Sequence, residues 1–161
     1  MTVIGLGANV GFPDRAFERA LSGLSPDVEG LALSPVYRTA PVGGPPQDDF
    51  LNAVARGWTR LPPLGLLRLL QRLEREAGRD ASVERNGPRP LDLDLLLYGD
   101  LLIDQPELVV PHPRLAGRRF VLAPLADLLP DLIVPGTGRT VASLLAEAPP
   151  ARVERRAPSP G

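Results

Sequence analysis

The chain has 161 residues and a mass of 17.2 kDa, with 18 basic side chains, 19 acidic side chains and a net charge of −1. It has no cysteine and one histidine, which excludes disulfides, thiol catalysis and zinc sites built from cysteine or several histidines. All basic residues are arginine, so catalysis by lysine and phosphate binding by lysine are excluded too. The balanced charge indicates no nucleic-acid or membrane partner.

Chain length and terminal composition predict one domain in the cytoplasm. About 100–200 residues is the usual size of a domain, and a chain of this size buries enough surface to fold without a metal or disulfide. No apolar run approaches about 18 residues, and the first residues lack the features of a signal peptide. We therefore expect a monomeric domain over residues 1–147 and a flexible, proline-rich tail over 148–161.

The spacing of apolar residues predicts the elements of the first half of the chain. It indicates a strand over 2–6 that leads into a tight loop, and then a helix opened by Pro13 that carries Phe17, Ala20, Leu21 and Leu24 on one face. A strand over 31–38 contains Pro35, which favours an edge position or a bulge. A loop over 39–49, rich in glycine and proline, precedes a strand over 50–58.

The second half is predicted in the same way. A helix starts at Pro62-Pro63 and ends at Gly78, and its buried stripe consists of Leu66, Leu69, Leu70 and Leu73. A polar loop over 79–90 leads to a strand over 91–98, and a short helix is predicted over 124–129. The resulting order, β-α-β-β-α-β, predicts an α+β, ferredoxin-like core, in which helices pack on an antiparallel sheet, with a small C-terminal addition. This fold carries many unrelated functions, so it does not predict the chemistry.

Two aspartates on the strand over 91–98 are the first indication of chemistry. Asp92 and Asp94 are two residues apart, so their side chains share one face, while Leu91, Leu93, Leu95 and Leu97 are predicted on the other. Paired carboxylates repel each other unless a cation lies between them, and oxygen ligands suit magnesium shared with substrate phosphates. An edge strand with two solvated aspartates is the alternative interpretation.

The loop before these aspartates carries Arg79, Arg85 and Arg89. Guanidinium groups match phosphate oxygens, and arginines beside magnesium-binding carboxylates are what phosphoryl transfer requires. A solvated loop paired with Asp80 and Glu84 is the alternative, and it fits Arg85 better than Arg89.

Gly87-Pro88-Arg89-x-x-Asp92-Leu93-Asp94-Leu95-Leu96 resembles the signature of the 6-hydroxymethyl-7,8-dihydropterin pyrophosphokinase family. The resemblance extends over residues 2 to 135 through further blocks, which are Gly7-Ala8-Asn9, Tyr37-Arg38-Thr39, Phe50-Leu51-Asn52-Ala53, Gln71-Arg72-Leu73-Glu74, Gly78-Arg79, Pro111-His112-Pro113 and Arg118-Arg119-Phe120. It implies an enzyme that transfers pyrophosphate from ATP to the hydroxymethyl group of the reduced pterin, releasing AMP, in folate biosynthesis.

The resemblance also implies roles for individual residues. Asp92 and Asp94 would bind two magnesium ions, with Arg79 and Arg89 completing the catalytic set, and Asp92 would help to take the hydroxyl proton. The residues implied for ATP are Gln71, Glu74, Arg79, Arg89, Leu95, His112 and Arg118. Those implied for the pterin are Thr39, Val42, Phe50, Asn52, Asn86, Asp92 and Phe120. The loops over 39–49 and 79–90 would close over the substrates.

Two other classes of function remain open from the residues alone. A magnesium-dependent phosphodiesterase or other hydrolase would use the aspartates and arginines but would not explain Phe50, Asn52 and Phe120. A non-catalytic, ferredoxin-like module that senses a small ligand would need no aspartate pair beside an arginine loop. Pterin-dependent formation of AMP distinguishes the transferase from both.

Overall fold

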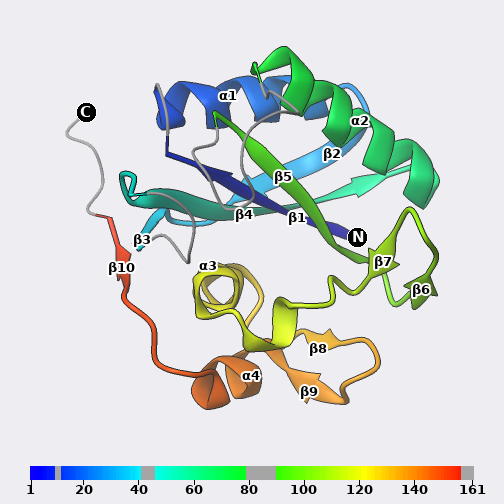
Figure 1. The fold of residues 1–161 in the computed structure, drawn as a ribbon. Coiled ribbons are helices and arrows are strands. Elements are labelled where there is room, and N and C mark those ends of the chain that lie inside the picture. Colours follow the sequence, from blue (N-terminus) through cyan, green and yellow to red (C-terminus); the bar gives the residue numbers. More distant parts are fainter. Residues whose placement is uncertain (10–11, 41–45, 79–89, 157–161) are drawn as a thin grey trace.

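The computed structural model describes residues 1–9, 12–40, 46–78 and 90–156 (Figure 1). In chain order the elements are β1 (Thr2–Ala8), α1 (Pro13–Leu24), β2 (Val28–Leu33), β3 (Tyr37–Thr39), β4 (Phe50–Thr59), α2 (Pro63–Glu76), β5 (Asp92–Tyr98), β6 (Ile103–Asp104), β7 (Val109–Val110), the 3-10 helix η1 (Leu115–Gly117), α3 (Arg119–Leu128), β8 (Ile133–Val134), β9 (Arg139–Thr140), α4 (Val141–Glu147) and β10 (Val153–Arg155). No helix among the described residues is long and apolar enough to span a membrane.

The main sheet is antiparallel, with the strand order β10-β3-β4-β1-β5, and β2 also pairs with β4. The strand predicted over 31–38 is therefore two strands, β2 and β3, which lie one after the other along β4. The break falls at Ser34-Pro35, because proline has no N–H to donate to a partner strand. Ser34 bridges the break: its backbone N–H donates to Val54 O at 2.8 Å, and its Oγ accepts from Val54 N at 2.9 Å.

Helices α1 and α2 cover one face of this sheet (Figure 1). The predicted leucine stripe of α2 is buried there, together with Phe17, Ala20 and Leu24 of α1. Gly78 follows α2 with φ +93°, a conformation that glycine adopts without strain, and so ends the helix as expected.

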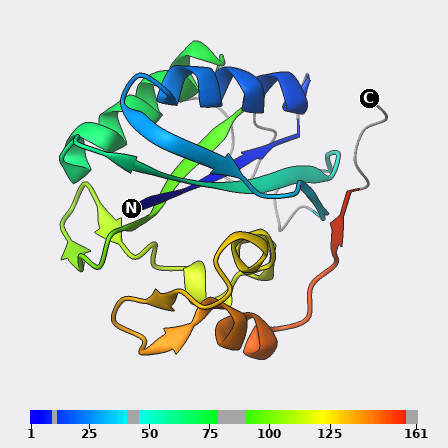
Figure 2. The same ribbon diagram turned by 180° about the vertical axis from the view of Figure 1, so that it is seen from behind.

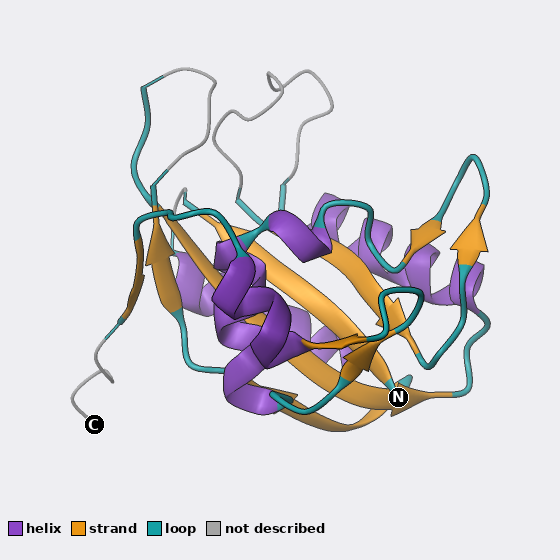
Figure 3. Ribbon diagram, turned by 90° about the horizontal axis from the view of Figure 1, so that it is seen from below, coloured by secondary structure: helices purple, strands orange, loops and turns teal. Residues whose placement is uncertain are grey.

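The opposite face is covered by α3, and α4 packs against α3 in the C-terminal addition (Figures 2 and 3). Leu122 and Leu125 of α3 pack with Val3 and Val54 of the sheet in a second core cluster. The helix predicted over 124–129 starts earlier, at Arg119, so Pro124 lies inside it and removes the hydrogen bond to the carbonyl of Phe120. The sheet thus has helices on both faces.

A bulge in β5 changes which face its last leucines occupy. Ile4 pairs with Leu95 but Val3 pairs with Leu97, so the register shifts at Leu96. Leu93 and Leu95 face α1 and α2, as predicted, whereas Leu96 and Leu97 both belong to the second core cluster. The prediction that Leu97 shares the face of Leu93 is therefore wrong, because the bulge directs the side chain of Leu97 to the opposite face of the sheet.

The segment after residue 147 also differs from the prediction of a flexible tail. Val153–Arg155 forms β10, which pairs with β3 and extends the sheet by one strand. Arg155 forms an ion pair with Asp127, and Arg156 donates two hydrogen bonds to the carboxylate of Asp14 at 2.6 and 3.0 Å. Strand pairing and charged contacts hold this segment, although it has few apolar side chains.

Candidate active site

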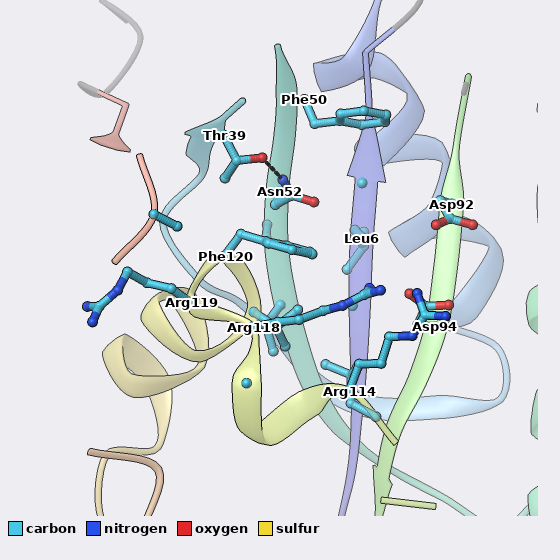
Figure 4. Close-up of a pocket in the computed structure, with 18 of the residues that line it drawn as sticks. Leu6, Thr39, Phe50, Asn52, Asp92, Asp94, Arg114, Arg118, Arg119 and Phe120 are labelled. Atoms are coloured by element: carbon cyan, nitrogen blue, oxygen red, sulfur yellow. Dashed lines mark hydrogen bonds between the residues drawn. The ribbon is translucent and has the colours of Figure 1, made fainter. Parts of the chain in front are cut away.

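A cavity of about 440 Å³ lies between the second face of the sheet and the start of α3 (Figure 4). Its walls come from β1, β3, β4, β5 and α3, from residues in and beside η1, and from the residues that follow α4. Seven of the residues predicted from the sequence line this one cavity, which are Thr39, Phe50, Asn52, Asp92, Asp94, Arg118 and Phe120.

Part of the floor of the cavity is glycine backbone. Gly7 lies between Asn52 of β4 and Asp92 of β5, because it pairs with both across the sheet. Gly5 pairs with Asp94 in the same way. A side chain at Gly7 would occupy the space between the amide of Asn52 and the carboxylate of Asp92, and one at Gly5 would contact the side chain of Leu96.

One half of the cavity combines two aromatic rings with an oriented amide. Phe50 begins β4 and Phe120 lies in the first turn of α3, and Figure 4 shows Asn52 between their rings. The amide Nδ2 of Asn52 donates to Thr39 Oγ1 at 2.6 Å. This bond fixes the amide and leaves Oδ1 over Gly7 as an acceptor in the cavity. Such an arrangement suits a flat, polar heterocycle.

Asn9, which belongs to one of the blocks that carry the family resemblance, forms hydrogen bonds with the residues that precede Phe50. Its Nδ2 donates to Gln47 Oε1 at 2.8 Å and to the backbone oxygen of Asp48 at 2.9 Å. The end of β1 is thereby tied to the residues that lead into Phe50. Asn9 is buried, so these hydrogen bonds hold the residues that lead into β4.

The other half of the cavity carries Asp92 and Asp94, with Arg114 and Arg118 extending toward Asp94 (Figure 4). Arg118 also places its guanidinium 5.3 Å from the ring centre of Phe120, so it lies between the two halves. Burial and then Arg114 lower the pKa of Arg118, while Asp94 and Asp92 act in the opposite direction. Two carboxylates and two guanidinium groups therefore meet at one end of the cavity.

His112 lies beside this end of the cavity but does not line it. Its backbone N–H donates to Leu96 O at 2.9 Å, and its Nδ1 accepts from the backbone N–H of Arg114 at 3.3 Å. Burial, then the charges of Arg118 and Arg114, lower the pKa of His112, against an opposing effect of Asp92. A neutral imidazole held this way carries its proton on Nε2.

Three other predicted ATP residues do not line the cavity. Glu74 of α2 is buried, and its Oε2 accepts the backbone N–H of Leu93 at 2.9 Å on the outer edge of β5. Gln71 is exposed on the same helix, and Leu95 is buried in the core between the sheet and α1 and α2. Glu74 thus holds the strand that carries the aspartates, from the face opposite to them.

The remaining predicted residues, Val42, Arg79, Asn86 and Arg89, lie outside the described residues, as do residues 41–45 of the first loop predicted to close and residues 79–89 of the second. Sequence reasoning missed Arg114, the glycine floor and residues 149–151, which all line the cavity. Glycines two apart in an apolar strand, at Gly5 and Gly7, were the available signal for the floor, because they indicate a close approach.

The donor set of the cavity fits magnesium, which prefers oxygen ligands. Among the described residues, no group of three or more histidine, cysteine, aspartate and glutamate side chains could hold a metal ion. Asp92 and Asp94 supply oxygen atoms only, and they border open space above Gly5 and Gly7. Magnesium is typically bound by one or two carboxylates together with substrate phosphates and water, so the residues present fit it.

Comparison with known proteins identifies the family. The model of the family described as 7,8-dihydro-6-hydroxymethylpterin-pyrophosphokinase (HPPK) matches residues 3–130. The chain belongs to this family. A 2-amino-4-hydroxy-6-hydroxymethyldihydropteridine pyrophosphokinase of Pseudomonas aeruginosa is 45% identical over 154 residues, which cover 94% of each chain. The corresponding protein of Haemophilus influenzae is 40% identical and covers 83% of this chain and 84% of its own.

Other similar proteins are longer. A folate synthesis bifunctional protein of Arabidopsis thaliana is 48% identical over 130 residues, which cover 79% of this chain but 26% of the plant protein. A crystal structure of Plasmodium falciparum HPPK-DHPS superposes with a TM-score of 0.74 at 15% identity, over 91% of this chain and 45% of that one. That superposition confirms the predicted fold, and the sequence relatives confirm the predicted activity.

The chain is therefore an ATP-dependent diphosphotransferase of folate biosynthesis. It transfers pyrophosphate from ATP to 6-hydroxymethyl-7,8-dihydropterin and releases AMP. The hydrolase and the ligand-sensing module, which the residues alone left open, are not supported by these relatives.

Proposed function

We propose that the pterin binds between Phe50 and Phe120 and that the triphosphate of ATP binds beside Asp92 and Asp94. The single observation that carries this proposal is that the amide of Asn52 and the two carboxylates line one cavity with only glycine backbone between them. A bicyclic ring that accepts stacking on both sides would present its guanidine-like edge to Asn52 Oδ1. Its hydroxymethyl group would then point toward β5.

We further propose that Asp92 and Asp94 hold two magnesium ions together with the phosphates. Bound magnesium would neutralise phosphate charge and polarise the β-phosphorus. Arg114 and Arg118 lie at the same end of the cavity and would bind phosphate oxygens as charge spreads over them. Arg79 and Arg89 keep the phosphate-binding role that the sequence resemblance implies.

In this arrangement the hydroxymethyl oxygen of the pterin forms a bond to the β-phosphorus. The bond between that phosphorus and the oxygen bridging to the α-phosphate breaks, and AMP leaves with that oxygen. Asp92 would accept the hydroxyl proton, because it lies next to the aromatic half of the cavity, with only Gly7 between it and Asn52 across the sheet. The stacking rings and the fixed amide of Asn52 hold the pterin for this attack.

Substitution of Asp94 by asparagine tests the assignment. We expect Asp94→Asn to lower kcat for AMP formation by more than about 100-fold, since a metal ligand is lost without loss of a core contact. Pterin affinity, measured by calorimetry, should remain within about twofold, because Asp94 lies at the far end of the cavity. Asp104→Asn, on exposed β6, is the matched control and should leave both unchanged.

Near-normal turnover in Asp94→Asn would contradict the metal assignment. A large loss of pterin affinity in the same variant would contradict the proposed orientation.

From composition and charge we also propose that the enzyme acts as a monomer in the cytoplasm, without nucleic-acid or membrane partners. Size-exclusion chromatography with light scattering tests the monomeric state.

A further inference from the structure

Residues 149–151, which follow α4, form part of the cavity wall although they lie far along the chain from the other lining residues. They border the same cavity as Thr39, Phe50 and Asn52. We call Pro149, Pro150 and Ala151 the end wall. The end wall has no charged side chain, so it contributes shape to the cavity.

Arg119 holds the start of this segment. Its Nη2 donates to the backbone oxygen of Ala148 at 2.8 Å, and its Nε donates to that of Pro149 at 3.3 Å. Arg119 is the neighbour of Phe120 in α3, yet Figure 4 shows its side chain directed away from Asp92 and Asp94. The arginine next to the stacking ring thus positions the end wall.

The far side of the end wall is held by β10. Val153 pairs with Thr39, and the backbone N–H of Arg156 donates to Val36 O at 2.8 Å. Arg152 forms an ion pair with Asp49, the residue before Phe50, at 2.8 Å. Contacts on both sides therefore fix the end wall against the strands that supply the pterin half of the cavity.

The order of the strands decides which end of the substrate meets this wall. In the sequence β10-β3-β4-β1-β5, the aspartates on β5 and the segment joined to β10 occupy opposite edges of the sheet. A pterin whose hydroxymethyl group points toward Asp92 and Asp94 directs its amino-substituted pyrimidine edge toward β3 and the end wall.

We propose that the end wall limits how far the pyrimidine edge of the substrate can extend, and so makes the enzyme select pterins with an unsubstituted 2-amino group. This inference rests on the proposed function, because it requires the pterin to bind between Phe50 and Phe120. Arg119 is a positioning residue in this selection, acting through the backbone of the end wall. No step of the transfer itself depends on the wall.

Two variants loosen the wall in different ways. Arg119→Gln removes the hydrogen bonds to Ala148 and Pro149, and a chain that stops after Arg152 keeps the end wall but loses β10. Arg139→Gln is the matched control, because it breaks an arginine–glutamate pair that lies outside the cavity. Steady-state kinetics are measured with the natural pterin and with its N2-methyl analogue.

In both loosened variants we expect the KM for the natural pterin to rise about fivefold to tenfold, with the KM for MgATP within about twofold of the original. The preference for the natural pterin over the N2-methyl analogue, as a ratio of kcat/KM, should fall at least about fivefold. The control should change none of these values.

An unchanged preference in the shorter chain would overturn the proposal. Equal rises in both KM values, together with a lower Tm, would also overturn it, since they indicate general destabilisation. Phe50→Ala, measured in parallel, tests the proposed function separately. If Phe50→Ala leaves the KM for the pterin unchanged, the pterin site itself is misplaced. If Phe50→Ala raises that KM but the shorter chain keeps its preference for the natural pterin, only the proposed role of the end wall is rejected.

Discussion

Gly7 lies under the side-chain amide of Asn52, and a Cβ atom added at Gly7 would come within 2.9 Å of Asn52 Oδ1. The two residues pair across β1 and β4. Asn52 cannot simply move away, because its Nδ2 is bonded to the hydroxyl of buried Thr39. The glycine thus keeps the cavity open and also fixes the atom proposed to recognise the pterin.

Gly7→Ala should therefore weaken pterin binding more than nucleotide binding. The added methyl group must displace Oδ1 or break the bond to Thr39, at a cost of about 1–2 kcal/mol, which corresponds to a rise of about 5-fold to 30-fold in pterin KM. Steady-state kinetics with each substrate varied in turn measure the effect. Gly65→Ala, in α2 and outside the cavity, is the control, because its added Cβ would lie 3.2 Å or more from the nearest side-chain atom, and it should stay within about twofold. Equal effects of the two substitutions would contradict the steric explanation.

Glu74 is predicted to act on β5 and not by contact with the adenine nucleotide. Glu74→Ala leaves the backbone N–H of Leu93 without this acceptor and should lower the free energy of unfolding by about 1–3 kcal/mol. Glu74→Gln keeps an oxygen acceptor and should recover most of that loss. Urea denaturation of both variants measures the difference.

The control on the same helix is Glu76→Ala. Glu76 pairs with Arg72 at 3.5 Å on the exposed face, where such pairs contribute about 0.3–0.5 kcal/mol. If Glu74→Ala leaves stability unchanged and only raises the KM for MgATP, the sequence-based assignment of Glu74 to ATP is correct and the structural role is wrong.

The parts of the fold that follow from local pattern were predictable. The leucine stripe of α2 and the alternation that directs Asp92 and Asp94 away from Leu93 both depend on neighbours in the sequence. Strand β10 was not predictable in this way, because Val153–Arg155 shows no apolar alternation. It is held by pairing with β3 and by Asp127 and Asp14, all far away in the sequence.

The same distinction holds within the site. Phe50, Asn52 and Phe120 were found through the family resemblance, and the structure brings them into one cavity with the aspartates. Alternation along β5 already predicted Leu95 on the face opposite to Asp92 and Asp94, so its assignment to ATP came from motif position alone. Glu74 could not be placed in this way, because the motif does not indicate which face of α2 meets the cavity. The bulge at Leu96, which turned Leu97 over, depends on the register with β1 and leaves no mark in the sequence.

His112 should make stability depend on pH on the acid side. Its pKa lies below 6.5 in the folded chain, chiefly through burial, so between that lowered value and 6.5 the unfolded chain binds a proton that the folded chain does not. The contribution of His112 to stability is thus complete above pH 6.5 and is lost as the pH falls through the folded pKa. The free energy of unfolding of the free enzyme, compared with that of His112→Gln, should show a smaller difference at pH 5 than at pH 8. A difference that is constant with pH would mean that His112 has an ordinary pKa in the folded chain.

Arg118 joins the two halves of the site, because its guanidinium lies over Phe120 and extends toward Asp94. Arg118→Lys keeps the positive charge but loses the planar fork that binds phosphate at two points and the flat surface that stacks on the ring. We expect kcat/KM for MgATP to fall about 10-fold to 100-fold, with a smaller rise in pterin KM from the disturbed Phe120. Arg60→Lys, at an exposed position after β4, should change neither value. Activity near normal in Arg118→Lys would show that charge alone is required at this position, and the two-point contact with phosphate would then have to come from another arginine.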